Sequence, residues 1–341
     1  MTKKIEVAIV GAGAIGGVVG AYLIKGGHDV VFIDVNEEHV QKINEHGLTI
    51  EEKDNKFNVP AKAYTLDQYR SEGKTLKKVL LAVKALHTEH AVKGFADLLD
   101  EDGYVISFQN GLNEELIAEI IGEDRTMGCF INLFADYLEP GVISYGGVGS
   151  LYIGELNGEK TDRIKELHQA LLSWGDAKIT DNILGYLWSK LAYGSILTAS
   201  ATTNLTIAEF IEDMKYRPLV VALGQEVLQV ADKKDIKPEE FDDWEPSSVY
   251  PDHNPEEKPF DPLIARLRSY TKTRTGIWRD LAVRKRKTEV PQQLNPIIAE
   301  GQALGFQMPL LQELVQLITD IENGEREIDE KNLAELFKLI D

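Results

Sequence analysis

The stretch IEVAIVGAGAIGG, residues 5–17, decides the fold of this chain. Its β-branched start predicts a buried strand, and the glycines that follow have the spacing G-x-G-x-x-G at the start of a helical pattern. In such a unit the first glycine permits a tight turn, the second lets the backbone approach a pyrophosphate, and the third lets helix and strand pack closely. The phosphates then face the free N–H groups of the helix start. We therefore predict a dinucleotide-binding loop formed by Gly11, Gly13, Ala14, Ile15 and Gly16.

An acidic residue lies where such a loop needs one. Asp34 ends the next predicted strand, DVVFID at 29–34, roughly 20 residues after the first glycine. A carboxylate there accepts hydrogen bonds from both ribose hydroxyls and repels a 2′-phosphate. We therefore expect NAD(H) to be the preferred cofactor, with NADP(H) as the alternative. The competing interpretation is structural: glycines that serve packing only, and an aspartate that caps its strand.

Strands and helices alternate beyond this unit. Further buried strands are predicted at 77–83 and 104–108, a hairpin at 48–63, a strand-rich part at about 126–156, and a second hairpin at 141–155. This alternation predicts a parallel, doubly wound α/β sheet, and hence a Rossmann-type domain over 1–181. After Asp181 the strand signals nearly vanish. The second domain, 182–341, is predicted to be all-helical, with helices at 183–200, 206–232, 276–288, 292–305 and 309–323.

One segment of the second domain is irregular. Residues 235–262 hold six of the twelve prolines together with ten acidic residues. Because proline cannot continue a helix, the segment is predicted to be either a solvated acidic loop or a lid.

The bulk composition excludes several classes of partner. A formal net charge of −19 repels nucleic acid and anionic membranes, and no apolar run approaches the roughly 18 residues of a membrane span. Cys129 is the only cysteine, so an intrachain disulfide and a cysteine-rich zinc site are excluded, and the histidines lack metal spacing. We expect a cytoplasmic protein without a metal.

A basic stretch runs from Arg266 to Lys287 against this acidic background. Most of its charges are expected on a solvated helix face, some of them paired with the acidic segment. Arg274 and Arg279 are candidates for binding a substrate carboxylate or cofactor phosphates.

The chemistry of a nicotinamide enzyme needs a proton donor. Hydride transfer to a ketone leaves negative charge on oxygen, which must be polarised and protonated. No histidine falls in the 180–200 helix, whereas Lys190 lies there among Leu, Ala, Tyr and Trp. A partly buried lysine near a cationic nicotinamide ring would have its pKa lowered, which suits a general acid. The alternative is an ordinary surface lysine.

Five motifs in order resemble the ketopantoate reductases over nearly the whole chain. They are GAGAIGG, VKA with Lys84, QNGLN with Asn110, WSKLAYGSILT with Lys190, and KTE with Glu289. The resemblance implies reduction of a 2-oxo acid by a nicotinamide cofactor in a cleft between two domains, with ketopantoate giving pantoate as the lead reaction. It also implies a possible homodimer through the helical domain.

The same resemblance assigns roles to single residues. Lys190 would be the general acid, and Glu289 would bind a substrate hydroxyl or tune Lys190. Asn110 would hydrogen-bond near the nicotinamide and the reacting oxygen, and Lys84 would lie near the nicotinamide ribose or the substrate. Thr275 lies close to the position of a serine that the family uses on the substrate carboxylate, with a spacing to Glu289 that differs by about one residue.

The catalytic helix departs from the family pattern K-x-x-x-N-x-x-x-N. Here the three positions, which share one helix face, are Lys190, Gly194 and Thr198, with Thr198 as the remaining candidate for a substrate contact. A glycine inside a helix costs roughly 1 kcal/mol relative to alanine, so Gly194 indicates either space beside the substrate or close helix packing. The substrate could therefore be ketopantoate or another oxo or hydroxy acid, and a non-enzymatic dinucleotide sensor is a third interpretation.

Overall fold

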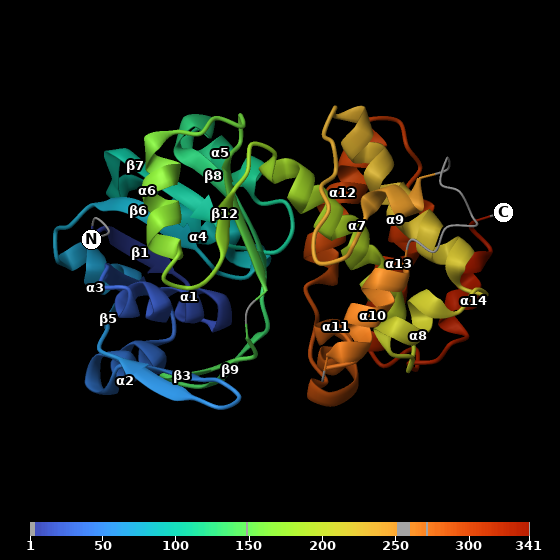
Figure 1. Cartoon of the computed structure of the whole chain (residues 1–341), viewed down its shortest axis with the longest axis horizontal. Helices are drawn as coiled ribbons and strands as arrows, with labels where there is room; N and C mark the ends of the chain where they lie inside the picture. The colour runs from blue at the N-terminus through green and yellow to red at the C-terminus, as the bar shows by residue number, and fades with distance from the viewer. Residues whose placement is uncertain (1–3, 148, 251–259, 271, 341) are drawn as a thin grey trace. The chain divides into compact units, whose positions relative to one another are not determined.

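The computed structural model describes residues 4–147, 149–250, 260–270 and 272–340. The chain divides into two compact units, Met1–Ile183 and Leu184–Asp341, of which the first is α/β and the second helical (Figure 1).

An eight-stranded sheet forms the centre of the first unit. Its spatial order is β12-β11-β8-β7-β6-β1-β2-β5. Adjacent strands are parallel except β11 and β8, which are antiparallel, so the parallel sheet expected from the sequence is wrong for this one pair. The strand bounds are β1 Glu6–Val10, β2 Asp29–Ile33, β5 Lys62–Tyr64, β6 Leu76–Leu81, β7 Leu99–Ser107, β8 Thr126–Asn132, β11 Ser150–Glu155 and β12 Ala177–Ile179.

Helices cover both faces of this sheet, because successive side chains of a buried strand point to opposite faces. In β1, Val7 and Ile9 join one core cluster, which includes α1 and α6, while Ala8 and Val10 join another, which includes residues of α3, α4 and α5. This arrangement confirms the predicted doubly wound α/β class. The helix bounds are α1 Ala14–Lys25, α2 Glu37–His46, α3 Leu66–Ser71, α4 Thr88–Phe95, α5 Glu114–Ile121 and α6 Asp162–Leu171.

A second, four-stranded sheet has the order β4-β3-β10-β9. Strands β3 (Leu48–Glu51) and β4 (Lys56–Val59) form the hairpin expected at 48–63. The hairpin expected at 141–155 is wrong, because β10 (Val142–Tyr145) pairs with β9 (Ala135–Glu139) and β3, whereas β11 belongs to the large sheet. The chain crosses between the sheets where Gly146 N–H donates to the Phe134 carbonyl at 2.6 Å.

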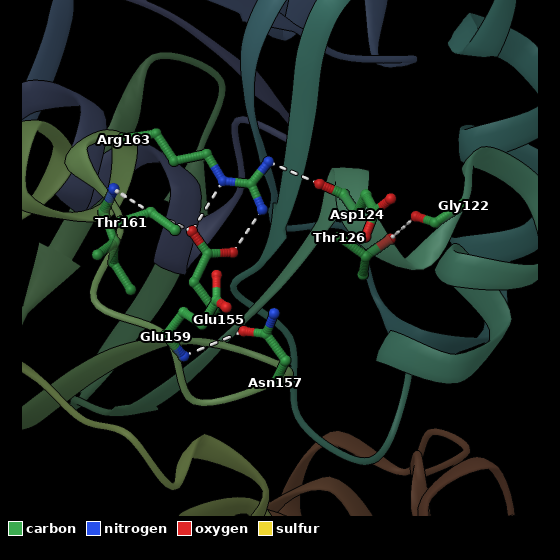
Figure 2. A network of polar contacts seen from close by, with 9 residues as sticks. Gly122, Asp124, Thr126, Glu155, Asn157, Glu159, Thr161 and Arg163 are labelled. Carbon is green, nitrogen blue, oxygen red and sulfur yellow. Dashed lines mark hydrogen bonds and ion pairs between the residues drawn. The ribbon is translucent and has the colours of Figure 1, made fainter.

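An ion pair joins α6 to β11, beside the antiparallel β11–β8 pair of the large sheet. The guanidinium of Arg163 in α6 donates hydrogen bonds to both carboxylate oxygens of Glu155 in β11. It also donates to the Asp124 carbonyl at 2.7 Å (Figure 2). Thr161, which caps α6, also donates to Glu155. Since Glu155 is only 3% exposed, these bonds compensate for the desolvation of its charge.

Apart from an isolated bridge between Phe241 and Trp244, the regular secondary structure in the described part of the second unit is helical. The helix expected at 206–232 is interrupted, because Asp213 is extended and Pro218 begins a new helix. The helix expected at 276–288 ends early, at Lys285 with φ 52°, after a π-helical segment at Asp280–Arg284. The bounds are α7 Ile183–Ala201, α8 Ile207–Glu212, α9 Arg217–Lys233, α10 Asp261–Ser269, α11 Gly276–Arg279, α12 Val290–Ala303, α13 Pro309–Glu322 and α14 Asn332–Phe337.

The proline-rich segment packs its apolar side chains where the structure describes it. Trp244 is 1% exposed, its indole N–H donates to Ser189 Oγ at 3.1 Å, and its ring lies 5.3 Å from that of Tyr193. Both partners are on α7, so this segment braces the helix that carries Lys190. The expectation of a solvated loop therefore holds for charged side chains such as Glu240 and Asp243, but it misses the burial of the apolar ones, while residues 251–259 lie outside the described residues.

Candidate functional site

The three glycines after β1 differ in what the fold requires of them. Gly11 has φ +96°, and a Cβ on it would lie 2.7 Å from the Val83 nitrogen. A Cβ on Gly16 would lie 2.1 Å from the Gly11 carbonyl oxygen, whereas one on Gly13 would have no described atom within 4 Å. The fold thus needs Gly11 and Gly16, and the open space at Gly13 fits the close approach of a pyrophosphate to the start of α1.

Asp34 lies directly against this loop. Its Oδ2 accepts from Ala12 N–H at 2.7 Å and its Oδ1 from Asn36 N–H at 2.9 Å. The carboxylate therefore does cap the end of β2, as the structural interpretation had it. Each oxygen keeps a further lone pair, so capping and ribose binding are compatible.

The strand ends bring the other candidates of the first unit to the same edge. Ala82 N–H donates to the Val10 carbonyl and Phe108 N–H to the Leu81 carbonyl, both at 2.8 Å, so the ladder extends past β1, β6 and β7. Lys84 and Asn110, both exposed, follow two of these strands. The edge where β1 leads to β2 on one side and to β6 on the other is a topological switch point, the usual place of a dinucleotide site in such sheets.

A buried network ties the Lys84 and Asn110 loops together. Gln109 Nε2 donates to the Val83 carbonyl and to Thr88 Oγ1, each at 2.8 Å. Thr88 Oγ1 is 3.1 Å from Asn113 Oδ1, and Asn113 Nδ2 donates to the Asn110 carbonyl at 3.0 Å. From the sequence, only Asn110 of this network was expected to have a role; the overlooked signal was the run of amides in QNGLN, which directly follows a buried strand.

Glu114 continues this network into the core. Its Oε2 accepts from Asn113 N–H at 3.0 Å, and its Oε1 has no hydrogen-bond partner among the described residues. Burial raises the pKa of the carboxyl to about 7, because desolvation disfavours its charged form.

Lys190, Gly194 and Thr198 follow each other on one face of α7. Lys190 is half-buried, and a Cβ on Gly194 would meet no described atom within 4 Å, so the close-packing explanation for this glycine is wrong. Thr198 is 3% exposed and its hydroxyl donates to the Gly194 carbonyl at 2.8 Å. With its proton so used, Thr198 offers a ligand lone pairs but no donor.

Thr275 and Glu289 begin two other helices of the same unit. Thr275 Oγ1 accepts from Trp278 N–H at 2.9 Å and thereby caps α11, which leaves its O–H available to donate. Glu289 is half-buried at the start of α12. Thr288, the residue before Glu289, is held by Glu322, to which no sequence motif pointed. One carboxylate oxygen of Glu322 accepts from both the N–H and the Oγ1 of Thr288, at 2.7 Å each.

The basic stretch is largely engaged by its neighbours. Arg266 pairs with Asp243 of the acidic segment at 2.8 Å, and Asp280 pairs with Arg284 at 2.8 Å. Arg274 donates twice to the Asn204 carbonyl, at 3.1 and 2.7 Å. The Nε of Arg279 is buried without a hydrogen-bond partner among the described residues, which leaves it the better candidate for an anionic ligand.

The described ranges hold neither a metal-binding cluster nor a membrane-spanning helix. These residues contain no group of three or more His, Cys, Asp or Glu side chains suited to a metal ion. None of their helices combines the length and apolarity needed to cross a membrane.

Family models match both units. Residues 7–158 match the model described as ketopantoate reductase PanE/ApbA, and residues 182–322 match its C-terminal counterpart. The chain belongs to the ketopantoate reductase family. As a member, it is an NAD(P)-dependent oxidoreductase that acts on a keto or hydroxy group, and the sensor interpretation loses its support.

Two curated relatives are both named 2-dehydropantoate 2-reductase. The protein from Pyrococcus horikoshii is 27% identical over 89% of this chain and 93% of its own length. The protein from Nostoc sp. is 30% identical over 64% of this chain and 70% of its own. Among solved structures, D-mandelate dehydrogenase with NADH and anilino(oxo)acetate has a TM-score of 0.78 at 22% identity, covering 94% of this chain and 98% of that one, which shows the same fold.

Proposed function

We propose that this protein is an NAD(H)-dependent 2-oxo acid reductase with ketopantoate as its lead substrate. The observation that carries the cofactor preference is the 2.7 Å bond from Ala12 N–H to Asp34 Oδ2. It supports a carboxylate beside the phosphate-binding loop, where a negative charge accepts ribose hydroxyls and repels a 2′-phosphate.

The chain's own residues would act as follows. A bound reduced nicotinamide supplies the hydride for the new C–H bond. Lys190 donates a hydrogen bond to the carbonyl oxygen and transfers its proton as the C=O π bond breaks, so that an alcohol and a neutral amine result. Glu289 binds a substrate hydroxyl or orients Lys190, Thr275 donates its O–H to the substrate carboxylate, and the Asn110 amide orients the reacting group. Lys84 holds the ribose or the substrate.

The test is an NADH-oxidation assay with ketopantoate beside a panel of 2-oxo acids, repeated with NADPH. We expect ketopantoate turnover with a kcat/KM for NADH above that for NADPH, and a loss of roughly 100-fold or more in kcat for Lys190→Ala, as for other general acids. Unchanged turnover in a folded Lys190→Ala protein would contradict the mechanism. A preference for NADPH would contradict the role of Asp34.

A second candidate is a dehydrogenase for a different 2-oxo or 2-hydroxy acid. The open space at Gly194 and the internal bond of Thr198 support it, because neither position offers the amide donors of the family pattern. The fold shared with D-mandelate dehydrogenase fits this candidate. Gly194→Asn separates the two: a rise in ketopantoate kcat/KM together with a loss on a bulkier acid favours the second candidate, and the reverse favours ketopantoate.

We propose a homodimer formed through the helical unit in the cytoplasm. Sedimentation equilibrium at micromolar concentration checks the stoichiometry, and a purely monomeric protein would contradict it.

A further inference from the structure

His39 is a buried histidine that contacts the dinucleotide loop from outside the glycine motif. It lies on α2, is 1% exposed, and its Nε2 is 2.9 Å from the Ala12 carbonyl oxygen. Its other ring nitrogen, Nδ1, is 2.9 Å from Gly141 N–H, in the turn between β9 and β10. Because the Gly141 N–H can only donate, Nδ1 must accept, and the ring proton therefore lies on Nε2 and is donated to Ala12.

The peptide groups around Ala12 are consequently held from two sides. Its N–H donates to Asp34, which directly follows β2, and its carbonyl accepts from His39 of α2. Tyr137 of β9 packs on the His39 ring, with centroids 5.1 Å apart at 65°. The orientation of the loop is therefore tied, through His39, to the turn at Gly141 in the small sheet, which lies 102 residues after His39.

We propose that His39 is a positioning residue for the cofactor: it fixes the Ala12 carbonyl so that the N–H groups at the start of α1 stay aimed at the pyrophosphate. A loop that is held in its binding conformation loses less entropy when the ligand binds. His39 thereby strengthens NADH binding without touching the reacting atoms. This inference rests on the cofactor role proposed for the glycine loop.

Two substitutions separate the two bonds of His39. In His39→Gln the amide nitrogen reaches the position of Nε2 and can donate to Ala12, whereas in His39→Asn the amide oxygen lies near the position of Nδ1 and can accept from Gly141. We expect His39→Asn to raise the NADH Kd roughly fivefold to tenfold, because the loss of one hydrogen bond weakens binding by about that factor. His39→Gln keeps the bond to Ala12 and should have an NADH Kd within about twofold of the wild type. Both should leave kcat at saturating NADH unchanged.

His28 provides a matched control at the opposite end of the strands. It is also buried, at 6% exposure, and its Nδ1 accepts from Ile5 N–H at 3.3 Å, just before β1. His28→Asn should lower thermal stability without changing the NADH Kd. If His39 only supported the fold, both His39 variants would lose stability, and their NADH Kd values would shift equally or not at all. That result would overturn the proposal.

Two further measurements complete the test. Gly13→Ala distinguishes the failure of this inference from the failure of the cofactor site. If Gly13→Ala leaves the NADH Kd unchanged, the loop itself does not bind the cofactor. If Gly13→Ala weakens NADH binding and the His39 variants do not, only the role of His39 is wrongly assigned. Should His39→Asn not fold, hydrogen exchange at the Ala12–Gly16 amides is compared between the wild type and His39→Gln. Equal protection supports the proposal, and faster exchange in His39→Gln overturns it.

Discussion

Single residues in the glycine loop separate the demands of the fold from those of the ligand. Gly11 and Gly16 have backbone atoms where a side chain would be, whereas Gly13 does not. The G-x-G-x-x-G spacing predicted a tight turn between a strand and a helix, which the structure has, but it could not distinguish these positions, since the distinction depends on what strand and helix place beside each one. Gly194 follows the same logic in α7: only the structure shows that the space beside it is open.

Gly13→Ala should therefore weaken cofactor binding in a stable protein. The added methyl group would occupy the path of the pyrophosphate, and we expect the NADH Kd to rise about tenfold or more, because the close backbone approach is lost. The thermal midpoint should stay within a degree or two of wild type. Fluorescence titration with NADH and a melting curve check both expectations.

Gly16→Ala is the matched control. The new Cβ would collide with the Gly11 carbonyl oxygen, so this variant should unfold at a much lower temperature. If Gly13→Ala were equally unstable, the open space seen at Gly13 would not be a property of the folded protein.

At the level of elements, α7 depends on a segment that the sequence did not place. The prolines and carboxylates of this segment, residues 235–262, correctly predicted an irregular loop. The burial of Phe241, Trp244 and Val249 within it was not predicted. Long-range partners explain the failure: Trp244 becomes a core residue only because Ser189 and Tyr193 of α7 face it. The small sheet was missed for a similar reason, since β3 and β10 pair across about ninety residues of chain.

Trp244→Ala should destabilise the helical unit and disturb α7. Removing a buried tryptophan costs about 3–5 kcal/mol of unfolding free energy. Trp244→Phe keeps most of the ring contact and loses the hydrogen bond to Ser189. The lost bond should lower the free energy of unfolding by about 1 kcal/mol, in addition to the effect of the smaller contact area.

Urea unfolding of both variants provides the measurement, with kcat as a second readout. If α7 positions Lys190, activity in the native state should fall more in Trp244→Ala than in Trp244→Phe. Equal stability of the alanine variant and the wild type would mean that the segment does not brace the helix.

Across the whole molecule, two buried carboxyls make stability depend on pH. Glu114 belongs to the first unit, and Glu226 to the second, where its carboxylate oxygens accept from Leu310 N–H at the start of α13 at 3.1 and 2.9 Å. Burial raises the pKa of each to about 7, from an ordinary value of 4.5. Between these two values the folded state binds more protons than the unfolded state.

Stability should therefore fall as pH rises. The contribution of each group is fully present below about pH 4.5 and is lost as pH rises through about 7. Melting curves between pH 5 and 8 should show the midpoint declining over this window. Glu226→Gln and Glu114→Gln cannot titrate, so each should flatten the decline; a slope unchanged in both variants would contradict the assignment.

The sequence alone determined the α/β-plus-helical class, the glycine loop, the acid that follows it, and the family, because these depend on local periodicity and on motifs whose residues lie close together in the chain. The tertiary structure decided which glycine of the loop has open space beside it, how Asp34 and His39 hold Ala12 from two sides, and where the proline-rich segment packs. Each of these rests on contacts between residues far apart in sequence, and such contacts exist only once strands and helices have packed.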